Sequence, residues 1–340
     1  MSLTRRTLLT RASVAAAGAV ASPAILHWPA QAAEFAYKCG TALPDGHPMV
    51  IRGKEAAAKI KEESGGKLDI TFYTNSVLGQ DTAMISQTIA GALEMYCLPI
   101  DLLAPKNEAC GIFGVGFAFD GYTHIWDAMD GELGGYLRGI AEQIGFHCIE
   151  KCPDHGFREI TMKSKPINTP DDLKGVKIRL PVAPYLIALF QALGASPTPI
   201  NFGEVYSALQ TGLVDGQENP LILIDTAKLY EVQKYCSMTN HVWAGIHYSF
   251  GNPYWKKLPA DLQQLSEKHF NAAALAERED WQKMTKDETQ NLTGKGMTFN
   301  TPDVKPFQEV LKKAGFYGEM KKKSGDKAWA LLEKYVGPLA

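Results

Sequence analysis

The segment Gly175-Val-Lys-Ile-Arg-Leu-Pro181 has the pattern of a short strand that leads into a helix, which is predicted over Tyr185–Leu193. Arg179 stands at the end of this strand, where α/β proteins hold their ligands. Arginine carries a planar fork of N–H donors that grips a carboxylate through two parallel hydrogen bonds. The segment therefore points to an α/β fold with an anion site, although a lone arginine is equally compatible with a surface ion pair.

Strand and helix patterns alternate on the N-terminal side of this segment. Strands are expected at Phe35–Cys39, Leu68–Phe72 and Leu93–Leu98. One helix starts at Pro48, which suits a first turn, and stops before Gly65; a second ends near Ala92. This βαβαβ order predicts parallel strand pairing.

A second set of units begins near Gly156. Short strands are expected at Ile160–Met162 and Val176–Ile178, with a capped helical turn between them over 169–175. The C-terminal part is mostly helical, over 261–292 and 307–335. No linker rich in Pro, Gly or Ser separates the two halves, which predicts two lobes joined by several crossings, with a cleft suited to a small ligand.

Residues 1–32 have the features of an export signal. Arg5-Arg6 is the twin arginine of a Tat-type signal, an apolar stretch follows, and Ala30-Gln31-Ala32 forms an A-x-A cleavage site. The apolar stretch is shorter than the ~20 residues that a membrane span needs. We therefore expect cleavage before Ala33 and a periplasmic mature protein that is not inserted in the membrane.

Composition narrows the classes of partner. The chain has 35 Lys and Arg against 37 Asp and Glu, and three of the arginines but no acid lie in residues 1–32. The remainder is therefore acidic by five charges, which argues against nucleic acid and anionic membranes as partners. The six cysteines lie mostly in apolar strand sequence, which favours buried thiols while leaving one disulfide open, and their spacing fits no zinc site.

No enzymatic constellation is present in the sequence. It has no G-x-S-x-G, no H-E-x-x-H and no phosphate-binding G-x-x-x-x-G-K-[ST], and Gly114-Val-Gly116 lacks the third glycine of a dinucleotide site. Asp154 and His155 are neighbours whose side chains point apart in an extended segment. We expect no enzyme, no cofactor and no metal.

A longer stretch carries a family resemblance. It reads Glu204-Val-Tyr-Ser-Ala-Leu-Gln-Thr-Gly-Leu-Val-Asp-Gly-Gln-Glu-Asn-Pro220, and it is preceded by Gly79–Met84 and Gly175–Pro181 and followed by Met238–His241. The chain resembles the periplasmic solute-binding subunit of the tripartite ATP-independent (TRAP) transporters, in the dicarboxylate- and sialic-acid-binding branch. The resemblance covers nearly all of the chain after residue 32.

The resemblance implies specific ligand residues. Arg179 matches the arginine that binds the ligand carboxylate, Arg158 matches a second arginine of the cleft, Asn219 matches an asparagine that donates to the carboxylate, and Phe202 matches an aromatic pocket residue. A structural ion pair remains the alternative for Arg158, and core packing the alternative for Phe202.

The first lobe departs from the sialic-acid binders. Pro99 replaces their glutamate and Gly40 replaces their asparagine, so the resemblance keeps the carboxylate contact while sialic acid itself is disfavoured. His155, His47 and Asp101 are further candidates for the cleft, although each histidine is also compatible with a surface or satisfied position.

The resemblance implies an α/β, two-lobed periplasmic-binding-protein-like fold with a ligand cleft between the lobes and long bracing helices. Lobe I is expected to comprise 33–155 plus about 244–284, and lobe II 156–243 plus about 285–340. The implied function is capture of an organic acid, with a sugar acid such as a hexuronate favoured, by hinge closure, and its delivery to TRAP membrane permease subunits by a monomer. The alternatives are a receptor for a C4-dicarboxylate or a 2-oxo or aromatic acid, a ligand-presenting sensory receptor and, with least support, a periplasmic enzyme acting on such acids.

Overall fold

The first sheet of the protein contains the parallel unit that the sequence predicts. The computed structural model describes residues 33–339, so the predicted export signal lies outside the described residues. In this sheet β1 pairs in parallel with both β2 and β3, in the order β2-β1-β3-β11-β4, and β5 also pairs with β11. Its strands are β1 (Phe35–Gly40), β2 (Leu68–Tyr73), β3 (Met95–Pro99), β4 (Phe146–Cys148), β5 (Asp154–Phe157) and β11 (Trp243–Gly251).

Local chemistry explains the first crossover. The helix α1 (Pro48–Glu63) starts with a proline in its first turn, and His47 caps it by accepting the Met49 N–H at Nδ1. It ends before Gly65 and Gly66, which have positive φ angles that disfavour other residues. The second crossover uses α2 (Asp81–Ala90), which ends at the left-handed Gly91. These elements confirm the predicted βαβαβ unit.

Strand β11 is an element that the sequence patterns above did not predict. It runs antiparallel to β3, β4 and β5 and stands in the middle of the first sheet. Ile246, Tyr248 and Phe250 alternate along it and are all buried. The register shifts between Ala244 and Gly245, a β-bulge of the kind that re-aims side chains.

The second sheet is mixed and has the order β12-β10-β6-β9-β7-β8. The capped turn predicted before β7 is confirmed: Thr169 and Asp172 form a capping box around a 3-10 turn. Strand β9 supplies three consecutive buried polar residues to the site described below. The strands are β6 (Glu159–Met162), β7 (Lys177–Leu180), β8 (Ser196–Pro199), β9 (Gly216–Asn219), β10 (Tyr235–Ser237) and β12 (Thr298–Asn300).

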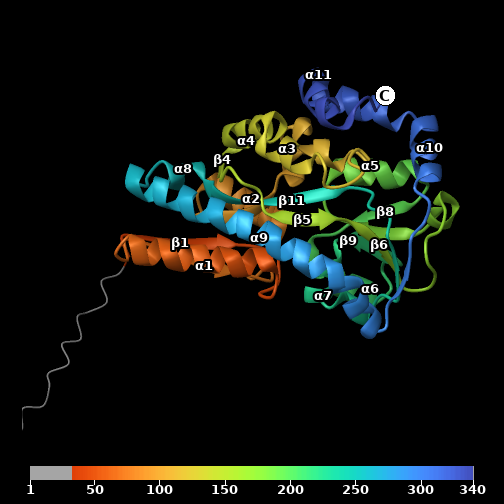
Figure 1. The fold of residues 1–340 in the computed structure, drawn as a ribbon, viewed down its shortest axis with the longest axis horizontal. Helices are drawn as coiled ribbons and strands as arrows, with labels where there is room; N and C mark the ends of the chain where they lie inside the picture. Colours follow the sequence, from red (N-terminus) through yellow and green to blue (C-terminus); the bar gives the residue numbers. More distant parts are fainter. Residues whose placement is uncertain (1–32, 340) are drawn as a thin grey trace, which may run out of the picture. The chain divides into compact units, whose positions relative to one another are not determined.

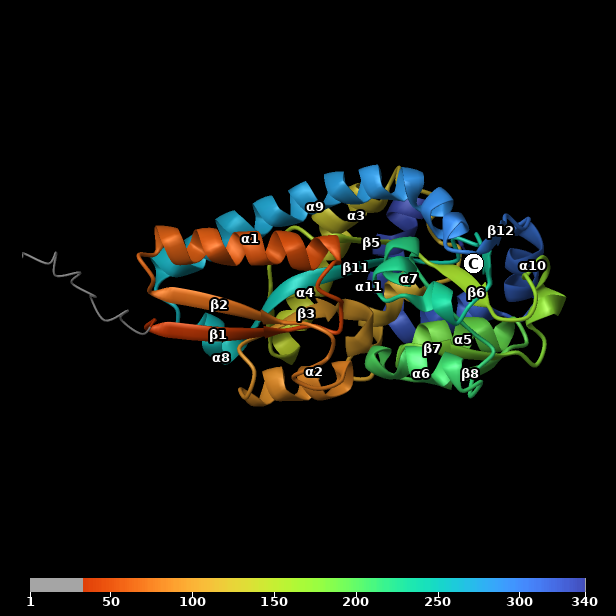
Figure 2. The same ribbon diagram turned by 90° about the horizontal axis from the view of Figure 1, so that it is seen from below.

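A single long helix extends along both sheets. Helix α9 (Ala260–Gly294) packs along α1 near the first sheet and reaches β12 of the second (Figures 1 and 2). The helical segment expected over 307–335 is broken in two by Gly315, whose φ is 70°, into α10 (Lys305–Lys313) and α11 (Phe316–Val336). Helix α11 packs against both α4 (Glu132–Ile144) and α5 (Pro184–Ala192).

The remaining short elements connect the sheets. They are α3 (Ile125–Asp130), α6 (Val205–Gln210), α7 (Leu221–Thr226), α8 (Asn252–Trp255) and the 3-10 turns η1 (Ile100–Leu103), η2 (Glu108–Gly114), η3 (Pro170–Leu173), η4 (Phe202–Glu204) and η5 (Leu229–Glu231). The turn η4 leads directly into α6.

Gly114 and Gly116, which resemble a partial dinucleotide motif, and the nearby Gly111 have a packing role. A Cβ on Gly111 would lie 2.2 Å from the Tyr185 ring, one on Gly114 would lie 2.7 Å from Tyr185 Cβ, and one on Gly116 would lie 2.4 Å from Leu189. Residues 111–116 therefore approach α5 so closely that only glycine fits at these three positions. This contact joins a segment of predicted lobe I to a helix of predicted lobe II.

The two-lobed α/β architecture agrees with the prediction. The residue boundaries of the lobes stay a prediction, which the division of strands between the two sheets supports. All six cysteines are buried and free, and Cys39 Sγ lies 3.8 Å from Cys97 Sγ. Within residues 33–339, no helix combines the length and apolar character needed to cross a membrane.

Candidate functional site

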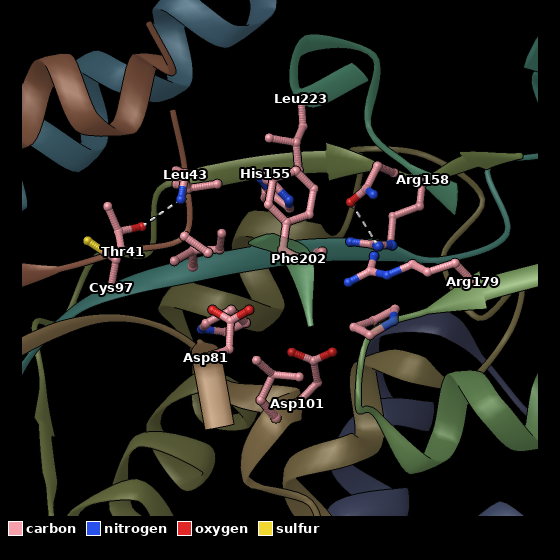
Figure 3. Close-up of a pocket in the computed structure, with 17 residues that line it drawn as sticks. Thr41, Leu43, Asp81, Cys97, Asp101, His155, Arg158, Arg179, Phe202 and Leu223 are labelled. Atoms are coloured by element: carbon pink, nitrogen blue, oxygen red, sulfur yellow. Dashed lines mark hydrogen bonds between the residues drawn. The ribbon is translucent and has the colours of Figure 1, made fainter. Parts of the chain in front are cut away.

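A pocket lies where the two sheets meet, at the ends of their strands (Figure 3). Its walls come from the segments that follow β1 and β3, from β3, β5, β7, β9 and β11, and from α2, η4 and α7. The lining residues are Thr41, Ala42, Leu43, Asp81, Cys97, Pro99, Asp101, Leu102, His155, Arg158, Arg179, Pro181, Phe202, Asn219, Leu223, Ala244 and Ile246. Six of the seven predicted ligand residues are among them; His47 is not.

Arg179 is a buried cation without an anionic partner. It is 2% exposed, and its Nε donates to the Ile200 carbonyl oxygen at 2.8 Å. Among residues 33–339 it makes no ion pair, and burial lowers its pKa to about 10. The Phe202 ring lies 5.8 Å from the guanidinium carbon, so it covers one side of the group. The two terminal nitrogens of the guanidinium are left for a ligand in the pocket.

Arg158 forms a structural ion pair, which is the alternative that the sequence analysis gives for this residue. Its Nε and Nη2 contact the two carboxylate oxygens of Glu218, with Nη2 at 2.7 Å from Oε1, and Nη2 also donates to the Glu218 carbonyl at 2.9 Å. Burial opposes ionisation of Glu218, but the attraction and hydrogen bonds of Arg158, with help from His241, lower its pKa to about 2. Arg158 lines the pocket while its charge is already neutralised.

Asn219 connects Arg158 to a row of buried amides. Its Oδ1 accepts from Arg158 Nη2 at 3.0 Å, and its Nδ2 donates to Gln217 Oε1. Gln217 in turn donates from Nε2 to Thr161 Oγ1 at 2.9 Å. An amide nitrogen carries two hydrogens, so Asn219 retains one N–H after these contacts.

Two carboxylates face the pocket from the elements that precede and follow β3 in the chain. Asp101 lies in η1, and burial raises its pKa to about 6 while Arg158 acts in the opposite direction. Figure 3 shows its carboxylate turned toward the two guanidinium groups. Asp81, the first residue of α2, accepts the Tyr96 hydroxyl at 2.6 Å through Oδ1. Sugar hydroxyls are donors that such oxygens accept well.

The two histidines occupy different layers. His155 is 4% exposed and lines the pocket, whereas His47 is fully buried behind it and caps α1. Their ring centroids are 5.4 Å apart. Of the two first-lobe departures, Pro99 lines the pocket, and Gly40 packs so closely on Met84 and Leu93 that a Cβ there would lie 2.7 Å from the Met84 sulfur.

Sequence reasoning missed several lining residues. Thr41 directly follows β1, Asp81 starts the helix that leads to β3, and Ala244 lies at the bulge of β11. The rule that ligands bind beyond the carboxyl ends of parallel strands could have found Thr41. Ala244 has no comparable local signal, because its place depends on an antiparallel pairing.

The site is suited to binding rather than to catalysis. It offers an unpaired guanidinium, an aromatic and aliphatic wall, and carboxylate and imidazole groups that can contact hydroxyls. No group of His, Cys, Asp and Glu among the described residues is arranged to hold a metal ion. A two-lobed fold with such a pocket defines the class of solute-binding proteins.

Comparison with known proteins defines this class further. A model of the bacterial extracellular solute-binding protein family 7 matches residues 39–320, and the chain belongs to this family. Its members and structural neighbours are substrate-binding proteins of transporters, TRAP transporters among them, and not enzymes. The resemblance seen in the sequence is confirmed.

The relatives include proteins crystallised with sugar acids. Solute-binding protein RD1_1052 of Roseobacter denitrificans is 33% identical over 76% of this chain and 80% of its own length. Its structure with bound L-galactonate has a TM-score of 0.82, and the aligned region covers 89% of this chain and 99% of that one. The sugar acid binding protein DctPAm of Advenella mimigardefordensis, solved in complex with galactonate, is 25% identical with a TM-score of 0.85, covering 91% of this chain and 100% of that one.

Two further relatives differ from these in bound ligand or in length. A TRAP solute-binding protein of Sulfurospirillum deleyianum with bound succinate is 26% identical, with a TM-score of 0.83 over 89% of this chain and 99% of that one. The alignment with an uncharacterized protein of Sinorhizobium fredii is 32% identical over 77% of this chain and spans 48% of that protein's length.

Proposed function

We propose that this protein captures a monocarboxylic sugar acid in the periplasm and delivers it to the membrane permease subunits of a TRAP transporter. The observation that carries the proposal is Arg179, a buried guanidinium with no anionic partner among the described residues. Keeping a cation buried and unpaired is costly unless a ligand supplies the counter-charge. The ligand carboxylate is that counter-charge, held bidentately by Arg179, with Asn219 donating its remaining N–H.

The charge distribution favours a hydroxylated tail over a second carboxylate. Glu218 already neutralises Arg158, so Arg179 is the unpaired cation among the residues that line the pocket. Asp81 and Asp101 line the pocket as well. A dicarboxylate would bring its second negative charge into a pocket that holds these acids, whereas a polyhydroxylated chain would donate hydrogen bonds to them. The sugar acids bound by the Roseobacter and Advenella relatives support this choice, and succinate is the alternative ligand.

The proposal includes export and motion. The twin-arginine signal in residues 1–32 would take the chain to the periplasm, and the mature protein would act as a monomer without a cofactor. The pocket has walls from both sheets, so the lobes would close over the acid by a hinge movement, and the closed form would be the one that docks on the permease.

Isothermal titration calorimetry tests the ligand chemistry. We would titrate L-galactonate, D-galactonate, D-glucuronate and succinate, each beside its uncharged counterpart: galactonamides, D-glucose and succinamide. We expect a sugar acid to bind and its uncharged counterpart to be weaker by about 100-fold or more, since the charged hydrogen bonds of the guanidinium are lost. Equal affinities for acid and amide, or no binding of any acid, would overturn the proposal. Binding of succinate alone would select the C4-dicarboxylate alternative.

A further inference from the structure

Two buried histidines form a pair that begins at the wall of the pocket and leads away from it. The rings of His155, in β5, and His47, before α1, are 5.4 Å apart between centroids and inclined by 35°. Both pack on the Trp281 indole of α9, at 5.7 Å for His47 and 6.1 Å for His155. The pair is therefore fixed by three different segments of the chain.

The hydrogen bond of the helix cap decides where His47 carries its proton. Its Nδ1 accepts the Met49 N–H at 3.3 Å, so this nitrogen is unprotonated. Burial lowers the pKa of His47 to about 3, so the ring is neutral. The one proton of the neutral ring must then be on Nε2, which is buried and has no partner among the described residues.

His155 presents the complementary arrangement. Its Nδ1 is buried and also has no partner among residues 33–339, so Nε2 is the ring nitrogen left for the pocket. If the proton of this neutral ring were on Nδ1, neither this nitrogen nor His47 Nε2 could accept a hydrogen bond from the other. If the proton is on Nε2, His155 Nδ1 accepts from His47, and an N–H donor is presented to the pocket.

We propose that His47 is a positioning residue for ligand recognition: its Nε2–H donates to Nδ1 of His155, directly or through one water, so that His155 offers an Nε2–H donor to an oxygen of the ligand. This inference rests on the proposed function for the identity of the ligand. The tautomers themselves are properties of the ligand-free protein. An acid with a hydroxyl or carbonyl oxygen beside His155 would accept this hydrogen bond. It would therefore bind more tightly than an analogue that lacks the oxygen.

Two acids near the pair could compete for the same contacts. Glu277 uses Oε2 to accept the Asp154 N–H at 2.7 Å, and its Oε1 is buried without a partner among residues 33–339. Burial raises the pKa of both carboxyl groups, so Glu277 could itself donate a proton to His155. The experiment must therefore separate His47 from Glu277.

Long-range 1H–15N spectra of the 15N-histidine-labelled protein distinguish the tautomers directly. We expect wild-type His47 and His155 both to be Nε2–H tautomers without ligand. His47→Asn retains a capping oxygen for the Met49 N–H but is too short to reach His155, so His155 should become a mixture of tautomers. His124→Asn, at the exposed start of α3, is the matched control and should leave His155 unchanged.

The outcomes separate the inference from the proposed function. The inference is overturned if wild-type His155 is the Nδ1–H tautomer, or if the His155 tautomer is unchanged in His47→Asn. If the His155 tautomer changes in Glu277→Gln and not in His47→Asn, the positioning role belongs to Glu277 and the inference is overturned as well. With L-galactonate as the probe, His47→Asn and His155→Phe should each weaken binding about three- to tenfold, and the double variant no further. If no acid binds wild-type protein, the proposed function fails, while the spectra still decide the tautomers.

Discussion

The Arg158 guanidinium and the Glu218 carboxylate form a two-pronged ion pair in the interior, with side chains 8% and 0% exposed. They face each other because β6 and β9 are antiparallel neighbours, with Ile160 opposite Glu218. His241 adds a contact from Nε2 to the same carboxylate at 3.1 Å. The two arginines of the pocket therefore differ: Arg158 is paired within the frame, whereas Arg179 is the arginine that we propose for the ligand.

Breaking this ion pair from one side should be strongly destabilising. Glu218→Gln leaves Arg158 buried without a counter-charge, and we expect a loss of about 3–5 kcal/mol in the free energy of unfolding. The double variant Arg158→Met with Glu218→Met removes both charges and should recover most of that loss. Urea unfolding of Arg158→Met, of Glu218→Met and of the double variant measures the coupling, and additive effects would contradict a direct pair.

Replacing Arg179 should weaken ligand binding without lowering the stability of the ligand-free protein, unlike breaking the Arg158–Glu218 pair. Because Arg179 has no anionic partner among the described residues, Arg179→Met removes an unpaired buried charge. The ligand-free variant should therefore unfold at the same temperature as wild type or higher. Binding of the sugar acid should weaken by about 100-fold or more. Arg179→Lys should also bind poorly, since a point charge cannot reproduce the fork.

Calorimetry and thermal unfolding together check the role of Arg179. Arg52→Lys, on the surface of α1, is the matched control, because Arg52 pairs with Asp280 and Glu55 and does not line the pocket. A large drop in the stability of ligand-free Arg179→Met with affinity retained would assign Arg179 to the frame instead.

The local patterns of the sequence predicted the elements that local chemistry determines. The proline start of α1, the capping box at Thr169 and the parallel crossovers all follow from residues close together in the chain. The place of Arg179 follows in the same way, because the end of a strand in an α/β sheet is a fixed kind of position.

The side-chain contacts between these elements depend on residues that are far apart in the sequence. The resemblance implied a ligand role for Arg158 and left a structural ion pair as the alternative. Nothing near Arg158 in the chain shows that Glu218 is its partner, because that contact depends on the β6–β9 pairing. Likewise His47 and His155 are brought together by the packing of α1, β5 and α9. Strand β11 did carry a local signal in the alternation of Ile246, Tyr248 and Phe250, which a strict search for period two would have found.

Glu159 should make stability depend on pH between about 4.5 and 8. Burial raises its pKa to about 8, against the opposing backbone hydrogen bonds of Asn240 and Thr239. The folded protein therefore holds a proton that the unfolded chain releases near its ordinary pKa. The stabilising contribution of Glu159 is complete below pH 4.5 and is lost as the pH rises to 8.

Glu159→Gln isolates this contribution, since the amide oxygen can still accept the Asn240 N–H that Glu159 accepts at 3.0 Å. The stability of wild type relative to the variant should fall by about 1.4 kcal/mol per pH unit across this window and level off above it. Urea unfolding from pH 4.5 to 9 measures the difference, with exposed Glu62→Gln as the control. A difference independent of pH would show that Glu159 is ionised in the fold.

Closure of the pocket should be blocked by a wedge at Gly203. This residue lies in η4, and a Cβ there would be 2.8 Å from Gln80 Oε1 and 3.1 Å from Ser76 Oγ, across the proposed boundary between the lobes. A Cβ alone can be accommodated if the end of the Gln80 side chain turns away, so Gly203→Ala should still close. The ring of Gly203→Phe should hold the two segments apart.

Small-angle scattering with and without the bound acid checks this wedge. At a ligand concentration near the wild-type dissociation constant, wild type and Gly203→Ala should have a clearly smaller average radius of gyration than without ligand, whereas Gly203→Phe should stay close to the ligand-free value. If the closed form of Gly203→Phe falls to about a tenth of the population, its apparent affinity should fall about tenfold. Gly121→Phe, where an added Cβ meets no atom within 4 Å, controls for the bulk of the new side chain. An unchanged radius in wild type at saturation would remove the hinge and leave a rigid binding module, because a ligand moves a conformational equilibrium only through its different affinities for the two states.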